Sequence, residues 1–317
     1  MKTILKKLFN ESEIIIYLYD RITGAYFKNF ISDERLIRKK FKNRLGRDLQ
    51  LDNPVKFNDK LQWLKLNWYD PLATKCADKY EVREFVSETI GEEYLNELYG
   101  VYESVDEIDI DKLPNSFVLK GTHGSGYNVI CKDKNKMNWD EEFKKMRRWL
   151  RLNYFWKVRQ WVYKDIKPRI VCEKFIEQEE GAELRDYRFF CFNGNPKFIT
   201  VDFSITNKKN TRRNLYDLDW NLMEQEIAYP RELNLKVDKP DKLDKMIELS
   251  KKLSANFPHA RVDFYYIDNR IIFGEITFFH QGGMGKIKPL EFEDEMGSWL
   301  KLPKKPAITD TSNGRNL

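Results

Sequence analysis

The 317-residue chain is poor in the residue types that form disulfide frameworks and metal centres. It has four cysteines and three histidines, and no two cysteines are spaced as CxxC. A zinc site requires closer ligand spacing, and small disulfide-bonded proteins carry a denser cysteine pattern. The sequence therefore predicts reduced thiols in the core of a cytoplasmic protein, at Cys76, Cys131, Cys172 and Cys191.

The chain also lacks a hydrophobic run long enough to cross a membrane. Near its start, the apolar stretch Ile14 to Tyr17 has acidic residues on both sides, whereas a spanning helix takes about 20 apolar residues. The same stretch is too short for a signal peptide. We expect no transmembrane segment. A predicted helix over 33–44 that is dense in Lys and Arg leaves peripheral contact with an anionic membrane open.

Charge of one sign is not in large excess, because 56 basic and 50 acidic residues leave a formal net charge of +6. No basic run is interleaved with aromatic residues as in a nucleic-acid-binding module, so a nucleic-acid partner is not expected. The mild excess is compatible with an anionic substrate. Hydrophobic residues make up 41% of the chain, which is enough to build a core and excludes global disorder.

Two carboxylates lie inside apolar, strand-like runs in residues 261–283. The sequence RVDFYYIDNRIIFGEITF predicts two short strands joined by a turn at Asp268-Asn269. Asp263 lies five residues before this turn and Glu275 six residues after it, so the hairpin brings the carboxylates level. A divalent cation between them would relieve their repulsion. The alternative is an amphipathic hairpin with both carboxylates in solvent.

A glycine-rich loop follows a short strand in Pro114 to Gly126, PNSFVLKGTHGSG. Glycines permit positive φ and close backbone approach, so successive N–H groups can converge on phosphate oxygens, and Lys120 adds a positive charge. The pattern matches neither the P-loop nor the Rossmann fingerprint. Upstream, Lys79 and Arg83 are four residues apart on a predicted helix, where either could reach an anion. The alternatives are a hairpin loop without a ligand and a solvated helix face.

The remaining elements follow from hydrophobic periodicity and turn signals. Helices are expected at 33–44, 57–68, within 139–161 and at 241–257, and strands at 117–120, 127–131 and 170–176. A second hairpin is expected from strands at 187–192 and 196–201, joined at Asn193-Gly194. Residues 202–231 are expected to form a loop-rich excursion.

The order of these motifs resembles the ATP-grasp superfamily of carboxylate–amine ligases, and most closely its TupA-like branch from bacterial surface-polysaccharide biosynthesis. The resemblance runs from about Phe27 to Pro289 and rests on NPVKFNDKLQWLKL, ADKYEVREFV, LPNSFVLKGTHGSG, DYRFFCFNG and RVDFYYIDNRIIFGEITF. It implies an α+β ATP-grasp fold, with two α+β subdomains holding ATP between antiparallel sheets. The expected division is a helical N-terminal region (1–75), an ATP-grasp domain (76–300) with a lid at about 115–175 and a metal-binding subdomain at about 176–300, and a loose tail (301–317).

The resemblance also implies which residues hold the nucleotide. Those expected at the ATP phosphates are Lys79, Lys120 and the loop residues Gly121, His123, Gly124, Ser125 and Gly126. Those expected to bond adenine, chiefly through backbone groups, are Glu173, Lys174, Phe175 and Ile176.

The resemblance also assigns magnesium and the reacting carboxylate to the hairpin at 261–277. Asp263 and Glu275 are expected to bind magnesium with Thr277, which stands where many ATP-grasp enzymes have an Asn. Arg261 shares a face with Asp263 and is expected to stabilise an acyl-phosphate. His280 is a candidate for substrate contact, His123 for contact with the γ-phosphate, and Lys120 is grouped with the catalytic residues.

The implied activity joins a uronic-acid carboxylate of a polysaccharide precursor to an amine or amino acid, using ATP and magnesium. A glycosyltransferase is one alternative, since Asp109-Ile110-Asp111 has the letters of a DxD motif, although it lies in an acidic, turn-like segment. Another is an ATP-grasp-like kinase. The presence of Lys120, Asp263 and Glu275 disfavours a non-catalytic carbohydrate-binding relative, but it does not separate ligase from kinase.

Overall fold

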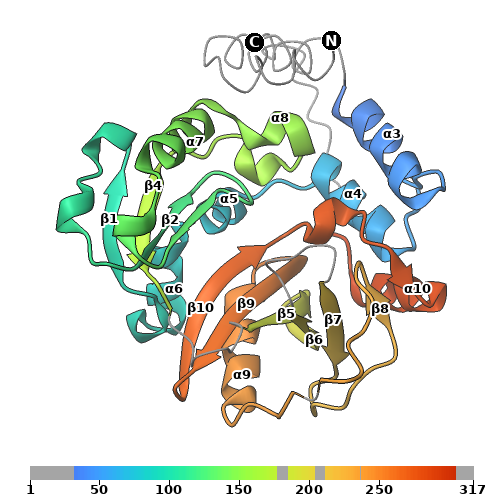
Figure 1. The fold of residues 1–317 in the computed structure, drawn as a ribbon. Coiled ribbons are helices and arrows are strands. Elements are labelled where there is room, and N and C mark those ends of the chain that lie inside the picture. Colours follow the sequence, from blue (N-terminus) through green and yellow to red (C-terminus); the bar gives the residue numbers. More distant parts are fainter. Residues whose placement is uncertain (1–31, 177–184, 204–210, 236, 305–317) are drawn as a thin grey trace.

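The computed structural model describes residues 32–176, 185–203, 211–235 and 237–304 (Figure 1). Its helices are α3 (Asp33–Leu45), α4 (Phe57–Asn67), α5 (Pro71–Ala77), α6 (Val82–Ile90), α7 (Trp139–Arg151), α8 (Tyr154–Val158), α9 (Leu243–Ser254) and α10 (Leu290–Trp299). The short 3₁₀ turns include η3 (Ile110–Lys112), η5 (Trp161–Tyr163) and η6 (His280–Gly283). The strands pair antiparallel throughout, which confirms the predicted α+β class.

The first sheet has four strands in the order β1-β4-β2-β3. They are β1 (Leu98–Tyr102), β2 (Phe117–Gly121), β3 (Asn128–Cys131) and β4 (Ile170–Lys174). Helix α7 covers this sheet: Trp139 stacks on Phe117 with ring centroids 5.7 Å apart, and Met146 is fully buried. The β2–β3 hairpin and β4 lie where the sequence predicts strands, whereas the pattern does not predict β1, which pairs with β4 from outside residues 115–175.

The second sheet has five strands in the order β10-β9-β5-β6-β7. They are β5 (Asp186–Phe192), β6 (Asn195–Phe203), β7 (Arg212–Tyr216), β9 (His259–Ile267) and β10 (Arg270–Thr277). Alternation along the strands sends one set of side chains toward α9, where the Cys191 thiol donates to the Ser250 carbonyl at 3.9 Å. All four cysteines are buried free thiols, as the sequence predicts.

The prediction of a loop-rich excursion over 202–231 is wrong for residues 202–203, 212–216 and 226–227, which lie in strands. Strand β6 runs to Phe203, and β7 adds a fifth strand to the sheet. A two-residue strand, β8 (Glu226–Ile227), then pairs with β11 (Ile287–Lys288). Charged residues open β7, so its apolar alternation is too short to be recognised as a strand.

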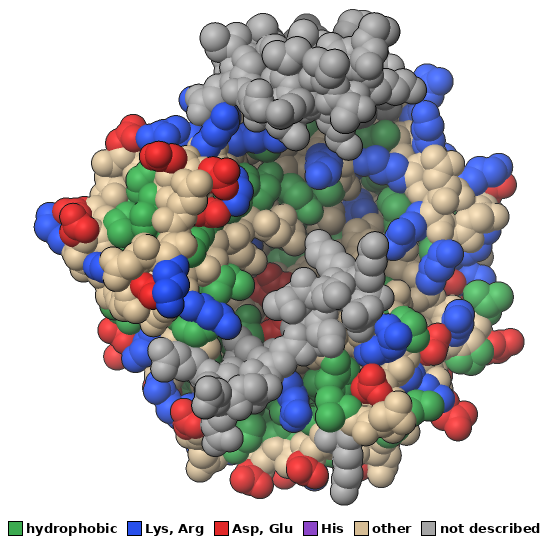
Figure 2. All heavy atoms as spheres, viewed as in Figure 1, with side chains coloured by type: hydrophobic (Ala, Val, Ile, Leu, Met, Phe, Trp, Pro, Cys, Tyr) green, Lys and Arg blue, Asp and Glu red, His purple; other side chains and the backbone are tan. Residues whose placement is uncertain are grey.

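Helices α4 and α10 close one end of the five-stranded sheet (Figure 1). Phe57 of α4 packs on Phe192 with ring centroids 5.6 Å apart, and Trp299 of α10 packs on the same ring at 5.4 Å. At the other end the sheet faces a hollow. Figure 2 shows this hollow between the two lobes, with acidic side chains at its floor.

Candidate active site

The predicted carboxylate hairpin forms as β9 and β10, joined by a turn in which Asp268 and Asn269 both have positive φ. Asp263 and Glu275 are direct cross-strand partners, and a bulge between Phe273 and Glu275 takes up the extra residue on the second strand. The Asp263 side chain is buried, whereas that of Glu275 is 44% exposed. The hairpin therefore presents two adjacent carboxylates at different depths.

Arg261 lies between these carboxylates. Its guanidinium donates to both oxygens of Asp263, at 2.7 Å from Nε and 2.5 Å from Nη2, and to Oε1 of Glu275 at 2.7 Å. The Thr277 hydroxyl donates to the same Glu275 oxygen at 3.0 Å. The protein thus balances the carboxylate pair with a fixed internal cation, and Thr277 orients Glu275 from the same strand face.

The two carboxylates differ in the direction of their pKa shifts. Burial raises the pKa of Asp263 to about 7, against the opposing effect of Arg261. Burial acts the same way on Glu275, but the charges of Arg261 and Lys79 outweigh it and hold the pKa of Glu275 at about 2. Glu275 is therefore the carboxylate that stays ionised throughout the physiological range.

Four further charged residues extend this network across the sheet, and the sequence does not single them out as a site. Arg213 on β7 donates to both oxygens of Asp202 on β6, at 2.5 and 2.7 Å. Arg188 on β5 contacts Asp202 and donates to Asp186 at 2.6 Å, and its Nε lies 3.6 Å from Asp263. Because Asp202 and Asp263 pair with arginines on neighbouring strands, this charge network forms only when the sheet assembles.

His280 connects the two ends of this charge network. Its Nδ1 lies 2.8 Å from Arg261 Nη1, and its Nε2 lies 3.0 Å from Arg213 Nη1. Burial, together with the charges of Arg213 and Arg261, lowers the pKa of His280 well below its usual value. A neutral imidazole has one acceptor nitrogen. The ring therefore accepts a hydrogen bond from only one of the two guanidinium groups at a time.

The glycine-rich loop connects β2 to β3 and lies next to Lys79. The Lys79 ammonium donates to the Gly124 carbonyl at 2.6 Å, and the backbone N–H of Lys79 donates to the Thr122 carbonyl. A Cβ at Gly124 would lie 2.8 Å from the Tyr127 ring, so this glycine is needed for packing. Gly126 has a φ of +79°, which favours glycine.

Two tyrosines from the α8–η5 segment lie near both the glycine-rich loop and Glu275. Tyr154 and Tyr163 meet edge to face at 5.2 Å, and Tyr154 contacts Tyr127 at 6.0 Å. Burial, followed by the charge of Glu275, raises the pKa of Tyr163. Both tyrosines therefore lie near Glu275, although the sequence pattern does not distinguish them from core aromatics.

Lys120 and Glu173 face each other on neighbouring strands. Lys120 Nζ donates to Glu173 Oε2 at 2.7 Å, and Arg83 lies 3.6 Å from the other oxygen of Glu173. The backbone of Lys174 is bonded to the segment before β1, donating to the Glu97 carbonyl and accepting from Asn96. Phe175 and Ile176 follow the strand, half-buried, and the structure is described only as far as residue 176 at this point.

The other two histidines, His123 and His259, are buried. His123 is 1% exposed, and its Nε2 lies 2.7 Å from the Trp149 carbonyl, so its ring packs against α7. His259 is 1% exposed among phenylalanines, and its Nδ1 bonds the Phe278 carbonyl at 3.0 Å. Asp109-Ile110-Asp111 forms part of an exposed turn at η3, where Asp109 pairs with Lys112 at 3.0 Å.

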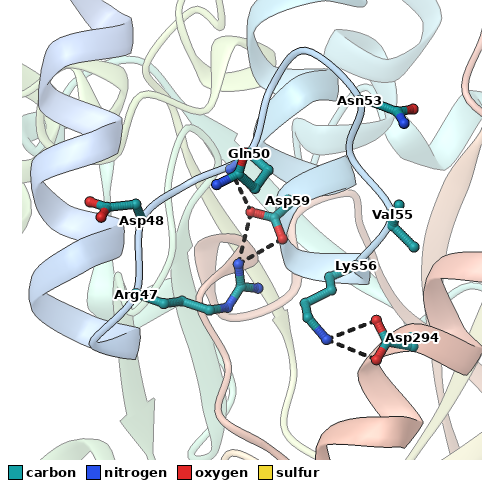
Figure 3. A pocket seen from close by; sticks show the side chains of 8 residues that line it. All are labelled: Arg47, Asp48, Gln50, Asn53, Val55, Lys56, Asp59 and Asp294. Carbon is teal, nitrogen blue, oxygen red and sulfur yellow. Dashed lines mark hydrogen bonds and ion pairs between the residues drawn. The ribbon is translucent and has the colours of Figure 1, made fainter.

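Outside the central hollow, a surface pocket of about 470 Å³ lies between the α3–α4 connection and α10 (Figure 3). Arg47 in this pocket donates to Asp59 and Glu293, and Lys56 pairs with Asp294 at 2.8 Å. These charges compensate one another. Within the described part of the chain, no three His, Cys, Asp or Glu side chains cluster as metal ligands, and no helix is long and apolar enough to cross a membrane.

Residues 59–301 match the protein family described as TupA-like ATPgrasp. No curated protein matches the chain. Among solved structures, D-alanine–D-alanine ligase from Bacillus anthracis complexed with ATP is 15% identical with a TM-score of 0.42, covering 78% of this chain and 83% of that one. Another structure of the B. anthracis ligase is 15% identical with a TM-score of 0.36, covering 64% of this chain and 57% of that one. The ligase from Helicobacter pylori is 14% identical with a TM-score of 0.41, covering 80% and 68%.

Proposed function

The chain belongs to the TupA-like ATP-grasp family and is by that membership an ATP-dependent ligase of the carboxylate–amine class; we propose that it forms an amide on a surface-polysaccharide precursor. The observation that carries the proposal is the carboxylate pair Asp263 and Glu275, held in register on β9 and β10 beside Arg261. The proposed substrates are a uronic-acid carboxylate and an amine or amino acid.

The residues at the site fit magnesium and a nucleoside triphosphate. Magnesium takes oxygen ligands and typically uses one or two carboxylates together with water and phosphate oxygens. Asp263 and Glu275 supply two carboxylates from adjacent strands, and Glu275 is accessible from the hollow. Lys79 lies close enough to Glu275 and Lys120 for both of their charges to affect the pKa of its ammonium group. We propose that both lysines bind the triphosphate beneath the Gly121–Gly126 loop.

In this proposal the side chains act by positioning and electrostatics. When bound between Asp263 and Glu275, magnesium supplies positive charge to the phosphate oxygens. Thr277 orients Glu275 through its hydroxyl, and the position it occupies makes it a candidate third ligand. Lys120 is set by its ion pair with Glu173 on the opposite strand. No protein nucleophile is required, because the substrate carboxylate itself takes the phosphoryl group.

Arg261 is proposed to stabilise the acyl-phosphate. In the structure its guanidinium is committed to Asp263, Glu275 and His280. Cation binding to the two carboxylates competes for the same oxygens, so it leaves more of the guanidinium available to an anionic substrate. His280 is proposed as the residue that keeps Arg261 oriented during this exchange, through the hydrogen bond at Nδ1.

The lobes have distinct proposed parts. The four-stranded sheet and its loop act as the lid over the nucleotide, adenine lies against Glu173 to Ile176, and the five-stranded sheet carries the metal and the acceptor. The enzyme is proposed to work in the cytoplasm, with peripheral contact at the membrane where the precursor is assembled. Helix α3, which carries six Lys and Arg, offers a basic face for that contact.

Product identity tests the proposed reaction. Purified protein is incubated with Mg–ATP, or with magnesium and UDP-sugars, over a panel of uronic acids and amino acids. The ligase should release ADP only when both an acid and an amine are present, and Mg–ATP should raise its melting temperature. Stabilisation by UDP-sugars alone would contradict the proposal. Release of AMP would indicate an adenylate intermediate in place of the acyl-phosphate. Release of ADP when a sugar is the only other substrate would indicate a kinase.

A further inference from the structure

Side chains around the carboxylate hairpin form a closed ring of contacts. They come from η6 and from strands β9, β5, β6 and β7, which are adjacent in the five-stranded sheet (Figure 1). Positive and negative side chains alternate around the ring, except where it closes through a histidine. In order, its members are Arg261, Asp263, Arg188, Asp202, Arg213 and His280. Asp202 therefore lies opposite Arg261 in the ring.

Asp202 holds the two arginines that lead to either side of Arg261. Its Oδ1 and Oδ2 accept from Nε and Nη2 of Arg213 at 2.5 and 2.7 Å, and Oδ2 also accepts from Arg188 Nη1. Asp202 and Arg213 are direct cross-strand partners, and so are Arg188 and Asp263. Because the register of the sheet fixes these pairs, the backbone sets the dimensions of the ring.

Two arms extend from this carboxylate to the Arg261 guanidinium. In the first, Arg213 Nη1 lies 3.0 Å from His280 Nε2, and His280 Nδ1 lies 2.8 Å from Arg261 Nη1. In the second, Arg188 Nε lies 3.6 Å from Asp263 Oδ2, the oxygen that accepts from Arg261 Nη2 at 2.5 Å. One arm therefore contacts Nη1 of the guanidinium and the other contacts Nη2.

The ring is an expensive way to hold a sheet together. Five of its members are buried, and the Arg188 side chain is 13% exposed. Buried ion pairs contribute little to stability compared with apolar side chains of similar volume. Holding a reactive group in one orientation, by contrast, requires hydrogen bonds on the residues that contact it. The charges of the ring are thus better suited to orienting a guanidinium than to stabilising the fold.

We infer that Asp202 is a positioning residue that sets the orientation of the Arg261 guanidinium through the two arms. Its oxygens are engaged by Arg188 and Arg213, so it acts through these neighbours. The consequence for catalysis rests on the proposed function, in which Arg261 stabilises the acyl-phosphate. The effect on Arg261 itself does not, so loss of Asp202 should loosen this guanidinium in the protein without substrate.

NMR of the full chain, labelled with ¹⁵N in arginine, measures this loosening. The Arg261 Nε–H signal is identified by its loss in Arg261→Lys. Its exchange rate with solvent is compared with backbone amides of β9, so that any loss of global stability cancels. Asp202→Asn should raise this relative rate by about tenfold or more, because the bond from Arg261 Nε to Asp263 opens more often. An unchanged rate would overturn the inference.

Asp186→Asn is the matched control. Asp186 also accepts from Arg188, at 2.6 Å, but it lies outside the ring. This variant should keep the relative exchange rate of Arg261 within about twofold of wild type. Equal acceleration in the two variants would mean that any carboxylate lost beside Arg188 loosens Arg261, which would overturn the specific role of Asp202.

Arg213→Met decides the question if Asp202→Asn does not fold. It opens the arm through His280 and leaves Asp202 paired with Arg188, so that this buried carboxylate keeps a cation. The relative exchange rate of Arg261 should rise by about threefold or more, because one arm is lost and the other remains. A wild-type rate in Arg213→Met would overturn the inference.

Turnover gives a second readout that a purely structural role would not produce. With acid and amine saturating, Asp202→Asn should lower kcat for ADP release by about tenfold or more and keep the wild-type KM for ATP. An unchanged kcat with a raised KM for ATP would place the effect at the nucleotide and contradict the positioning role. Failure of the proposed function is distinguishable, because the wild type would then release no ADP while the exchange rate of Arg261 still responds to Asp202→Asn.

Discussion

At the residue scale, the central feature is one guanidinium shared by two carboxylates. Arg261 bonds Asp263 through both of its oxygens and Glu275 through one, while His280 contacts the remaining Nη1. Each of these side chains would be unfavourable in the sheet alone. Together they form a charge-compensated group.

Lys120 is the proposed phosphate ligand that a single substitution tests most simply. Lys120→Ala should lower ATP turnover by about 100-fold or more, because it removes a positive charge that is proposed to face the triphosphate. The fold should persist, since Arg83 remains 3.6 Å from Glu173. Initial rates of ADP release give the measurement. Lys136→Ala is the control, as that side chain is 83% exposed and pairs with Asp133. A Lys120 variant as active as this control would contradict the assignment.

His259 predicts a pH dependence of stability. Burial lowers the pKa of His259 from 6.5 to about 4, so the unfolded chain binds a proton that the folded protein excludes between these values. Stability due to this group is complete above pH 6.5 and falls as the pH decreases toward 4, by about 3 kcal/mol in total. Urea unfolding at several pH values should show this loss in wild type and a shallower slope in His259→Phe. Parallel slopes in the two proteins would contradict the burial of a neutral imidazole.

The site residues that can be predicted from the sequence are those marked by a pattern among their near neighbours in the chain. Asp263 and Glu275 are recognisable because each interrupts an apolar strand and the Asp268-Asn269 turn fixes their register. Asp202 and Arg213 are not, because their significance comes from pairing between β6 and β7. A charge in a short, polar strand looks like a loop residue until its partner strand is known.

At the element scale, α4 and α10 determine where η6 lies. Gln62 of α4 donates to the carbonyls of Gly282 and Gly283, and Lys60 donates to Gly297 and Leu300 at the end of α10. The turn that carries His280 is therefore held by α4, a helix distant from it in sequence, and α4 is in turn bonded to α10. Displacement of α10 should therefore shift η6 and His280 in the candidate active site.

Gly297 tests this docking. A Cβ at this position would lie 2.0 Å from the Val55 carbonyl oxygen, and neither backbone can yield easily. Gly297→Ala should reduce the free energy of unfolding by about 1 to 3 kcal/mol or more, which chemical denaturation measures. Ser298→Ala is the control on the exposed side of the same helix. An alanine variant of Gly297 as stable as this control would show that α10 is not closely packed here.

Predictability also differs between elements. The hairpins β5–β6 and β9–β10 are recognisable because Asn193-Gly194 and Asp268-Asn269 adopt positive φ, the conformation their residue types favour. Strand β1 is not, because Gly100 interrupts its middle and a register shift occurs between Leu98 and Gly100. The residues of β1 have a weak preference for strand, and pairing with β4 compensates for it. The periodicity of the sequence does not reveal this pairing.

At the scale of the whole molecule, the two sheets place opposite charges on the walls of one hollow. The four-stranded sheet contributes Lys120, Lys79 bonds its glycine-rich loop, and the five-stranded sheet contributes Asp263 and Glu275. A triphosphate with magnesium matches this arrangement, since its phosphates suit the lysines and its metal suits the acids. Neither lobe carries the whole set.

The most direct test is therefore whether magnesium and nucleotide bind together and depend on Glu275. Isothermal titration of a non-hydrolysable ATP analogue, with and without magnesium, is compared for wild type and Glu275→Gln. Wild type should bind the analogue about tenfold or more tightly when magnesium is present. Glu275→Gln should lose most of that enhancement and keep its magnesium-free affinity. Binding in wild type that is indifferent to magnesium, or an equal enhancement in the variant, would contradict the magnesium–nucleotide site.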